Sequence, residues 1–209
     1  MCVVHGHGGD FAGELARRLA ARGWQTVLLT SAPIPVVEGT DVFHADPADP
    51  ESLDLALEEI RRAYGRLSAY VEITARPESG AADMLSHASK AQLKSTFLAA
   101  KSLKPLLTDP DLPRAWHVTV DRFDGKLGLA GSGSSARRTG GGISGLAKTL
   151  GQEWPSVFCR NLDLHPDFNL EEAVDIVIAE IFDPDSSLAE VGRHPEGRFT
   201  IAAVEESHA

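Results

Sequence analysis

The sequence is poor in cysteine and has no long apolar run. Its 209 residues include only two cysteines, Cys2 and Cys159, which are too few for a disulfide framework. Both lie in short apolar, strand-like runs, so we expect buried free thiols. No stretch approaches the roughly 18 apolar residues of a membrane span, and no basic segment leads into an apolar secretory core. We therefore expect a cytoplasmic protein.

Basic residues are the minority among the charged side chains. Lysine and arginine number 20 against 30 aspartates and glutamates, which gives a formal net charge of −10. A chain with this balance repels phosphate backbones and anionic lipid surfaces. Nucleic acid and membranes are therefore not expected as partners.

Strand-like and helix-like segments alternate along the whole chain. This alternation predicts an α/β fold, a Rossmann-like doubly wound parallel sheet of about seven strands with helices on both faces. One such domain fits the length of residues 1–209. The strands are expected at 2–4, 26–29, 42–44, 70–73, 116–120, 157–164 and 198–204. The helices are expected at 11–22, from Asp46 and Asp49 to Tyr64, through Leu93 to near Pro105, at 142–154, and from Asn169 to Ile181.

Local patterns support three of these helices. The second carries one apolar stripe at helical spacing, formed by Leu53, Ala56, Leu57, Ile60, Ala63 and Tyr64. Asn169 with Glu172 three residues later is typical of a capping box, and the helix that follows should turn Ala173, Ile176, Val177 and Ile181 inward. The stretch 121–142 is rich in glycine, serine and arginine and predicts a loop. The helix that begins near Gly142 should place Ile143, Leu146, Ala147 and Leu150 on one face.

Four segments carry a resemblance to a known family. They are the turn from His5-Gly6 into a helix ending at Arg22-Gly23, the segment 120–128, the segment 141–155, and 190–192 with 197–198. With them the chain resembles the short-chain dehydrogenase/reductase family over nearly its whole length. It is most similar to ketoreductase regions of iterative polyketide and polyunsaturated-fatty-acid synthases.

The resemblance implies four catalytic positions, and none of them holds the family's residue. A tyrosine hydroxyl protonates the nascent alkoxide in this family, a lysine four residues later lowers the pKa of that tyrosine, and a serine and an asparagine support them. The matching positions are Ala136 for tyrosine, Gly140 for lysine, Phe123 for serine and Gln92 for asparagine. We therefore expect no catalytic residue in this chain.

The missing tyrosine does not depend on the alignment. The chain has only two tyrosines, Tyr64 and Tyr70, and the residues four positions later are Ser68 and Thr74. A tyrosine followed by lysine at the required spacing is therefore absent from the whole sequence.

The family's phosphate-binding turn is also incomplete. Gly6 matches one of three expected glycines, while Asp10 and Ala12 occupy the other two positions. Asp10 would set a negative charge where backbone N–H groups should meet the cofactor pyrophosphate. Gly8 and Gly9 keep this vestigial loop flexible, which leaves weak nucleotide binding open. We nevertheless expect no cofactor in this chain.

The remaining positions for cofactor contacts are weak. Asp46 matches the family aspartate that meets the adenine ring, but Asp46-Pro47 is also ordinary helix-entry chemistry. The segment 30–33 after the second strand has no arginine for a 2′-phosphate.

Other polar groups suggest alternatives of lower weight. His5 and His7 have a spacing found in metal pairs, but no third or fourth ligand follows, so no metal site is expected. Arg137 and Arg138 beside Ser132, Ser134 and Ser135 are compatible with an anion-binding loop, although a solvated loop is favoured. Asp121 and Arg122 are candidates for an ion pair.

The resemblance implies a structural role. In the synthases named above, a ketoreductase is a tandem of two Rossmann-like halves, and the first half supports the second, which binds NADPH and is catalytic. The chain looks like that first half, excised from a larger polypeptide. Its expected partner is the catalytic half, any contact with acyl carrier protein would be indirect, and self-association is expected as an alternative when the chain is isolated.

Two other interpretations remain open from the sequence. One is an NADPH-dependent β-ketoacyl reductase with an atypical active site, and the other is a free-standing, nucleotide-binding regulatory homologue. A supporting half should expose an apolar patch for its companion. We expect that patch at the sheet edge beyond the last strand and on the helix bearing Ile143, Leu146 and Leu150.

Overall fold

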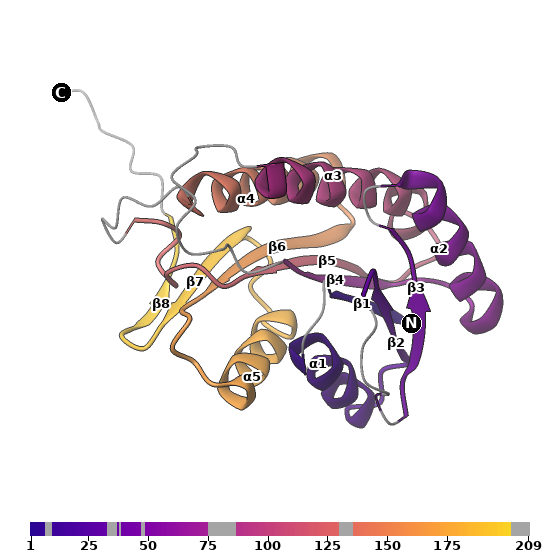
Figure 1. The fold of residues 1–209 in the computed structure, drawn as a ribbon, viewed down its shortest axis with the longest axis horizontal. Helices are drawn as coiled ribbons and strands as arrows, with labels where there is room; N and C mark the ends of the chain where they lie inside the picture. The colour runs from indigo at the N-terminus through magenta and orange to yellow at the C-terminus, as the bar shows by residue number, and fades with distance from the viewer. Residues whose placement is uncertain are drawn as a thin grey trace.

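A sheet of eight strands organises the part of the chain that the computed structural model describes (Figure 1). That part comprises residues 1–6, 10–32, 37, 39–46, 49–74, 87–129 and 136–201, with the backbone alone described at 87–89 and 136–141. The strands are β1 Cys2–Gly6, β2 Thr26–Thr30, β3 Asp41–His44, β4 Ala69–Ile73, β5 Ala115–Asp121, β6 Val157–Leu164, β7 Glu190–His194 and β8 Gly197–Phe199. The helices are α1 Asp10–Ala21, α2 Pro50–Tyr64, α3 His87–Leu107, α4 Ala136–Glu153 and α5 Leu170–Ile181.

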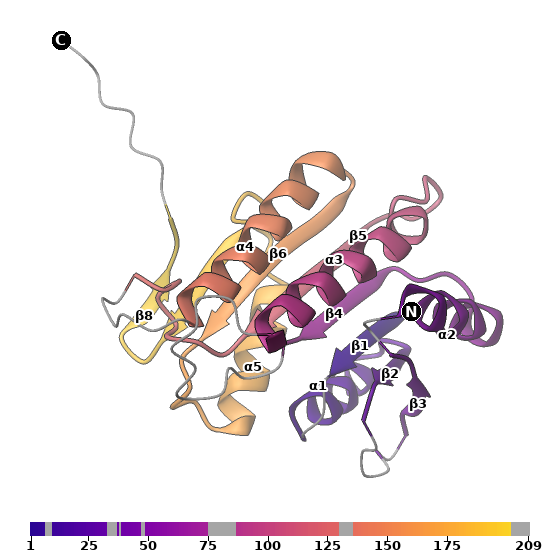
Figure 2. The same cartoon turned by 45° about the horizontal axis from the view of Figure 1, so that its top comes forward.

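The strand order is β3-β2-β1-β4-β5-β6-β7-β8, and only the β7–β8 pair is antiparallel. Helices α2, α3 and α4 cover one face of the sheet, and α1 and α5 cover the other (Figure 1). Figure 2 shows α3 and α4 side by side over β4, β5 and β6. Every residue of β1, β2, β4 and β6 is buried, because helices cover both faces of these central strands. The expected Rossmann-like doubly wound fold is confirmed.

The local helix signals work largely as expected. Asn169 Oδ1 accepts a hydrogen bond of 3.0 Å from the N–H of Glu172, and Glu172 Oε2 accepts one of 3.1 Å from the N–H of Asn169. This reciprocal pair is the capping box that starts α5. In α2 the stripe is buried from Leu53 to Ile60, whereas Ala63 is exposed in the last turn. Cys2 and Cys159 are buried free thiols, as expected.

Helix α4 begins earlier than the sequence suggested. It starts at Ala136 rather than near Gly142, so the expected loop over 121–142 is wrong in its last part. The reason lies in the packing of Gly142: a Cβ there would lie 2.6 Å from Leu93 Cδ2 on α3. Glycine at this position lets α3 and α4 approach closely. In the sequence, a glycine with this role looks the same as a glycine in a loop.

The expected last strand over 198–204 is found only at its start, as β8 Gly197–Phe199, and strand β7 before it was missed. The sheet continues with β7, parallel to β6, and a turn brings β8 back antiparallel. Only Val191 is fully apolar and buried in β7, so this strand lacks the pattern that sequence reasoning needs. Gly197 at φ +141° permits the tight reversal into the three-residue β8. Residues 202–204 lie outside the described residues.

The apolar patch expected on α4 is not found there. Ile143 and Leu150 are 1% and 5% exposed, and Leu146 is partly buried against the core cluster that contains Leu150. These three residues form the stripe that α4 packs on the sheet, so they are unavailable to a partner. The large apolar side chains that are exposed in the described ranges are Leu55, Phe97, Leu129, Phe182 and Ile201. No helix in these ranges is long and apolar enough to cross a membrane.

Candidate functional site

The order in which strands are added to the sheet changes direction between β1 and β4. The carboxyl ends of the strands next to this point form the candidate site. Strands β2 and β3 lie on one side of β1, and β4 to β8 lie on the other. Loops that leave the carboxyl ends of β1 and β4 therefore diverge, which is where doubly wound sheets bind ligands. Among the described candidates, Gly6, Asp46 and Asp121 lie at or just beyond the carboxyl ends of β1, β3 and β5.

The turn after β1 has a packing role. A Cβ on Gly6 would lie 2.5 Å from Ala12 Cβ, so only glycine allows β1 to meet α1 at this distance. Asp10 is exposed in the first turn of α1. An acid in this position is favourable for the helix dipole, but it occupies the positive end that would attract a phosphate. His7, Gly8 and Gly9 lie outside the described residues.

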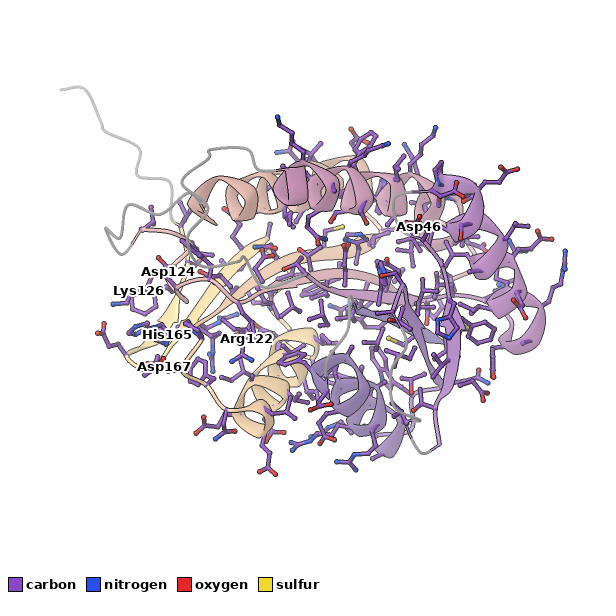
Figure 3. The ribbon with its side chains drawn as sticks, viewed as in Figure 1. Asp46, Arg122, Asp124, Lys126, His165 and Asp167 are labelled. Atoms are coloured by element: carbon purple, nitrogen blue, oxygen red, sulfur yellow. The ribbon has the colours of Figure 1, made fainter. Side chains whose placement is uncertain are left out.

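Asp46 lies apart from the other candidates. Its backbone N–H donates to Ser52 Oγ at 3.1 Å, and its carbonyl accepts from the N–H of Asp49. The exposed Asp46 therefore shapes the entry to α2. Figure 3 shows it near α2, on the opposite side of the molecule from Arg122 and Asp124.

Two of the four family positions, Gln92 and Phe123, have contacts of another kind, and the other two lie in α4 and not in the expected loop. Gln92 on α3 donates from Nε2 to Glu72 Oε1 at 3.1 Å. Phe123 follows β5 and donates its backbone N–H to Asp163 Oδ1 at 3.0 Å. Ala136 and Gly140 lie in the first turns of α4, where the backbone alone is described.

Neither tyrosine lies on α4. Tyr64 at the end of α2 hydrogen-bonds Asp41, and this contact raises the pKa of Tyr64. Tyr70 in β4 is fully buried and hydrogen-bonds His5 Nδ1 at 2.6 Å. Burial and, to a smaller extent, Glu72 raise the pKa of Tyr70 well above its usual value. Both environments act opposite to the lysine that activates a catalytic tyrosine.

A buried polar network under α3 was missed by sequence reasoning. Glu72 in β4 is fully buried and accepts hydrogen bonds from Thr96 Oγ1 at 2.9 Å and from Gln92. His117 in β5 is also fully buried, and its ring stacks on Tyr70 with centroids 5.8 Å apart. Burial lowers the pKa of His117 to about 4, so the ring is neutral at pH 7. A signal did exist: charged or ionisable residues inside strands expected to be buried on both faces require partners.

Asp121 ends β5 as a buried acid. It is 7% exposed, and Oδ1 accepts from Thr74 Oγ1 at 2.6 Å. Burial raises the pKa of Asp121 to about 6, against the opposing effect of the Thr74 hydrogen bond. Arg122 instead donates from Nη2 to the carbonyls of Pro166 and Phe168, at 3.1 and 2.6 Å. The two neighbours thus have separate partners, and the ion pair suggested by the sequence is not formed in the described contacts.

Asp163 in β6 fastens the segment 122–129 to the sheet. Its carboxylate oxygens accept from the N–H groups of Phe123 and Leu127 at 3.0 and 2.9 Å. Asp124 accepts from the N–H groups of Lys126 and Gly128 at 2.8 and 2.9 Å. Burial of Asp163, together with its hydrogen bond to Asp124, raises the pKa of Asp163 to about 7. The segment that matches the serine-bearing segment of the family is therefore held to the sheet by hydrogen bonds from its own backbone N–H groups.

The segment 122–129 also contacts β7 and the turn that follows it. Gly125 packs so tightly on β7 that a Cβ would lie 2.2 Å from the carbonyl oxygen of Arg193. Lys126 pairs with Glu196 in the turn after β7, with Nζ 2.5 Å from Oε2. Figure 3 shows Arg122, Asp124, Lys126, His165 and Asp167 gathered on the side of the molecule where β7 and β8 lie.

The site offers no obvious metal centre within the described residues. No group of three or more His, Cys, Asp or Glu side chains that could hold a metal occurs there. His5 is fully buried and engaged with Tyr70. The side chains of Ser132, Ser134, Ser135, Arg137 and Arg138 lie outside the described residues, so an anion-binding loop there stays a prediction.

The raised pKa of Asp163 predicts an unusual pH dependence of stability. Between about pH 4 and pH 7 the unfolded chain loses this proton while the folded chain keeps it, so stability falls as pH rises. Asp163→Asn removes this effect. The free energy of unfolding of the variant, relative to the natural chain, should therefore rise by about 2 kcal/mol or more from pH 4 to pH 8, measured by urea titration.

Asp167→Asn is the matched control for that experiment. Asp167 lies at the same end of the sheet, but its side chain is 79% exposed. This variant should differ from the natural chain by the same small amount at both pH values. A pH-independent difference for Asp163→Asn would show that the carboxyl is ionised in the folded chain.

Comparisons with known proteins agree with the fold. No protein-family model matches the chain. A metagenomic short-chain oxidoreductase, solved in complex with NADP, superimposes with a TM-score of 0.74 over 93% of this chain and 96% of its own, at 18% identity. A short-chain dehydrogenase from Rhodopseudomonas palustris gives a TM-score of 0.71 over 93% of this chain and 98% of its own, at 13% identity. The chain therefore has the short-chain dehydrogenase/reductase fold.

One curated protein resembles the chain in sequence. It is a polyunsaturated fatty acid synthase polypeptide of Thraustochytrium sp., 32% identical over an alignment of 161 residues that covers 74% of this chain. The chain spans only 5% of the length of that polypeptide. The resemblance to a polyunsaturated-fatty-acid synthase is thus confirmed.

Proposed function

We propose that the chain is the non-catalytic half of a ketoreductase region and stabilises a catalytic half in the same polypeptide. The observation that carries this proposal is the missing proton donor: no tyrosine is followed by lysine at the family's spacing. Tyr64 and Tyr70 lie on α2 and β4, and their surroundings raise rather than lower the pKa of both hydroxyls.

Two features of the carboxyl edge support the same proposal. Asp10 lies at the helix N-terminus where the pyrophosphate of a dinucleotide would lie. The segment after β5 is fastened by Asp163 and by the Gly125 contact with β7, so it is built as a fixed support. We accordingly assign no cofactor to this chain, and NADPH to the catalytic half. Acyl carrier protein would meet the catalytic half, and the whole region would work in the cytoplasm.

The synthase relative is far longer than this chain, which fits a role inside a larger polypeptide. A tandem partner that binds the folded form alone would raise its stability by mass action. The exposed Phe97 on α3 and Leu129 after β5 are better candidates for the contact than the buried stripe of α4.

A second candidate function is reduction by an atypical acid, and Asp121 is the observation that favours it. It is a buried carboxyl at the carboxyl edge with a pKa raised to about 6. A carboxyl of this kind holds a proton close to neutral pH and could donate it to an alkoxide.

An activity assay separates the two candidates. The purified chain is incubated with NADPH or NADH and acetoacetyl-CoA as the β-ketoacyl thioester, and nicotinamide absorbance is followed. We expect no oxidation above the protein-free rate, because hydride transfer leaves an alkoxide that no tyrosine protonates. Calorimetric titration with NADPH should likewise give no dissociation constant in the low micromolar range.

Asp121→Asn is the matched variant. Turnover that disappears in this variant would establish the atypical reductase and end the structural proposal. Co-expression with the region that follows in the coding sequence tests the support directly. If the two halves neither co-purify nor raise each other's melting temperature, the supporting role is wrong and a regulatory homologue becomes the better explanation.

A further inference from the structure

A pocket of about 500 Å³ lies at the amino edge of the sheet, opposite the edge described above. Its walls are the last turns of α4, the first residues of β6 and the segment 184–189 that leads into β7. Pockets of this size hold small organic ligands. None of the residues assigned to the carboxyl edge lines it.

The pocket follows from the pairing of β6. Strand β7 pairs with β6 only from Asn161 to Leu164, so the first residues of β6 have β5 as their only strand neighbour in the described sheet. The segment 184–189 does not fill the space beside the start of β6 where a longer β7 would lie. Arg160 fixes this segment by donating from Nε to the carbonyl of Leu188 at 2.9 Å and from Nη2 to the carbonyl of Asp185. The pocket is therefore a preformed part of the fold.

The polar lining is suited to an anion. Arg114 and Lys148 contribute cations, Ser156 and Ser186 contribute hydroxyls, and the described lining includes no carboxylate. The chain has a net charge of −10, so a pocket whose charged lining residues are both cations requires an explanation. The nearby acids are engaged elsewhere: Glu190 pairs with Lys148 at 3.0 Å, and Asp185 accepts hydrogen bonds from Ser187.

Arg114 is the cation that is available to a ligand. Its guanidinium carbon lies 5.1 Å from the ring centre of Trp116 and 5.4 Å from that of Phe158. It forms no ion pair with any residue in the described ranges. Stacking on two rings orients the planar group, which lowers the entropy lost when it binds an oxyanion bidentately. Lys148 contributes less, because Glu190 already neutralises it.

The rest of the lining is apolar. Pro155, Val157, Phe158 and Cys159 line the side formed by the start of β6, and Pro184 and Ala189 line the opposite side. Inorganic phosphate would leave most of this volume empty. A ligand that combines an anionic head with an apolar body fits both parts of the pocket.

We propose that this pocket binds an organic phosphate, a phosphate monoester whose phosphoryl group is held by Arg114 and Lys148 and whose apolar body contacts the start of β6. The several N–H and O–H donors of the lining suit the three terminal oxygens of a phosphate monoester. This site is separate from the nucleotide edge and does not depend on the proposed function.

The test uses phenyl phosphate as the probe, with inorganic phosphate and phenol as its two halves. Phenyl phosphate is titrated into the ¹⁵N-labelled chain and the amide resonances are followed. Saturable shifts are expected at residues 114, 148 and 156–159, with a dissociation constant of about 1 mM or tighter. Inorganic phosphate should bind more weakly, and the shifts caused by phenol should not saturate.

Arg114→Gln should weaken phenyl phosphate about tenfold, which corresponds to the loss of one charge-assisted interaction. Lys148→Gln should weaken it less. Arg62→Gln is the matched control, because Arg62 is an exposed arginine on α2 that pairs with Glu58 far from the pocket. The proposal is overturned by the absence of saturable shifts up to about 10 mM, by equal binding to Arg114→Gln, or by shifts confined to residues 122–129 at the other edge.

Discussion

Glu180→Ala should lower the free energy of unfolding by about 3 to 5 kcal/mol, measured by urea denaturation at pH 7. Glu180 is 3% exposed on α5, and Arg160 on β6 is fully buried. Arg160 Nη1 donates to Glu180 Oε2 at 3.0 Å, and Arg198 on β8 donates to both carboxylate oxygens at 2.9 and 2.8 Å. The substitution leaves the buried guanidinium of Arg160 with Asp183 as its remaining charged partner, at 3.2 Å.

The cost follows from desolvation. Burial already lowers the pKa of Arg160, which shows that its charge is held in a poorly solvated place. Glu58→Ala is the matched control, since Glu58 and its partner Arg62 on α2 are 55% and 74% exposed. That exposed pair should contribute no more than about 0.5 kcal/mol. Equal effects of the two substitutions would mean that Arg160 is adequately solvated or paired without Glu180.

The Arg160 cluster also shows where sequence reasoning stops. The apolar pattern of 157–164 predicted a buried strand, and β6 has those bounds. The same pattern contains an arginine, which a strand covered on both faces can bury only with partners. Its partners come from α5 and from the segment 183–188 after α5, and no local spacing connects those positions to β6.

Periodicity and capping fixed most elements because these signals are local. The stripe from Leu53 to Ile60 and the pair Asn169 and Glu172 are read within one or two helical turns. Glycines were harder to interpret. Gly142 permits a helix contact, Gly6 permits a strand to meet a helix, and Gly197 permits a turn, and these three roles look alike in sequence.

The candidate site likewise has features that the sequence could predict and features that it could not. The loss of the catalytic tyrosine and lysine is a property of the sequence itself, and Asp10 could be placed at a helix N-terminus from its position in the motif. The buried acids Glu72, Asp121 and Asp163 could not be assigned partners, because their contacts join β4, β5 and β6 to α3 and to the segment after β5. Burial between segments distant in the chain raises the pKa values of Asp121 and Asp163.

Gly125→Ala should be among the most destabilising substitutions at the carboxyl edge, with a loss of about 3 to 5 kcal/mol in the free energy of unfolding. Gly125 has φ +67°, which costs an L-residue roughly 1 kcal/mol. The larger part comes from contact, because the new Cβ would lie 2.2 Å from the carbonyl oxygen of Arg193, a backbone atom that cannot rotate away. Gly192 faces the same contact from β7, where a Cβ would lie 2.5 Å from the carbonyl oxygen of Gly125.

Gly23→Ala isolates the contact from the backbone strain. Gly23 has φ +87° in the turn that ends α1, where the N–H of Trp24 donates to the carbonyl of Leu19, and no heavy atom lies within 4 Å of the position its Cβ would take. This variant should therefore lose only about 1 kcal/mol, again measured by urea denaturation. A similar loss in both variants would show that the segment after β5 can move away from β7. Such a segment would be free to open toward a substrate, which would favour an atypical reductase over a fixed supporting half.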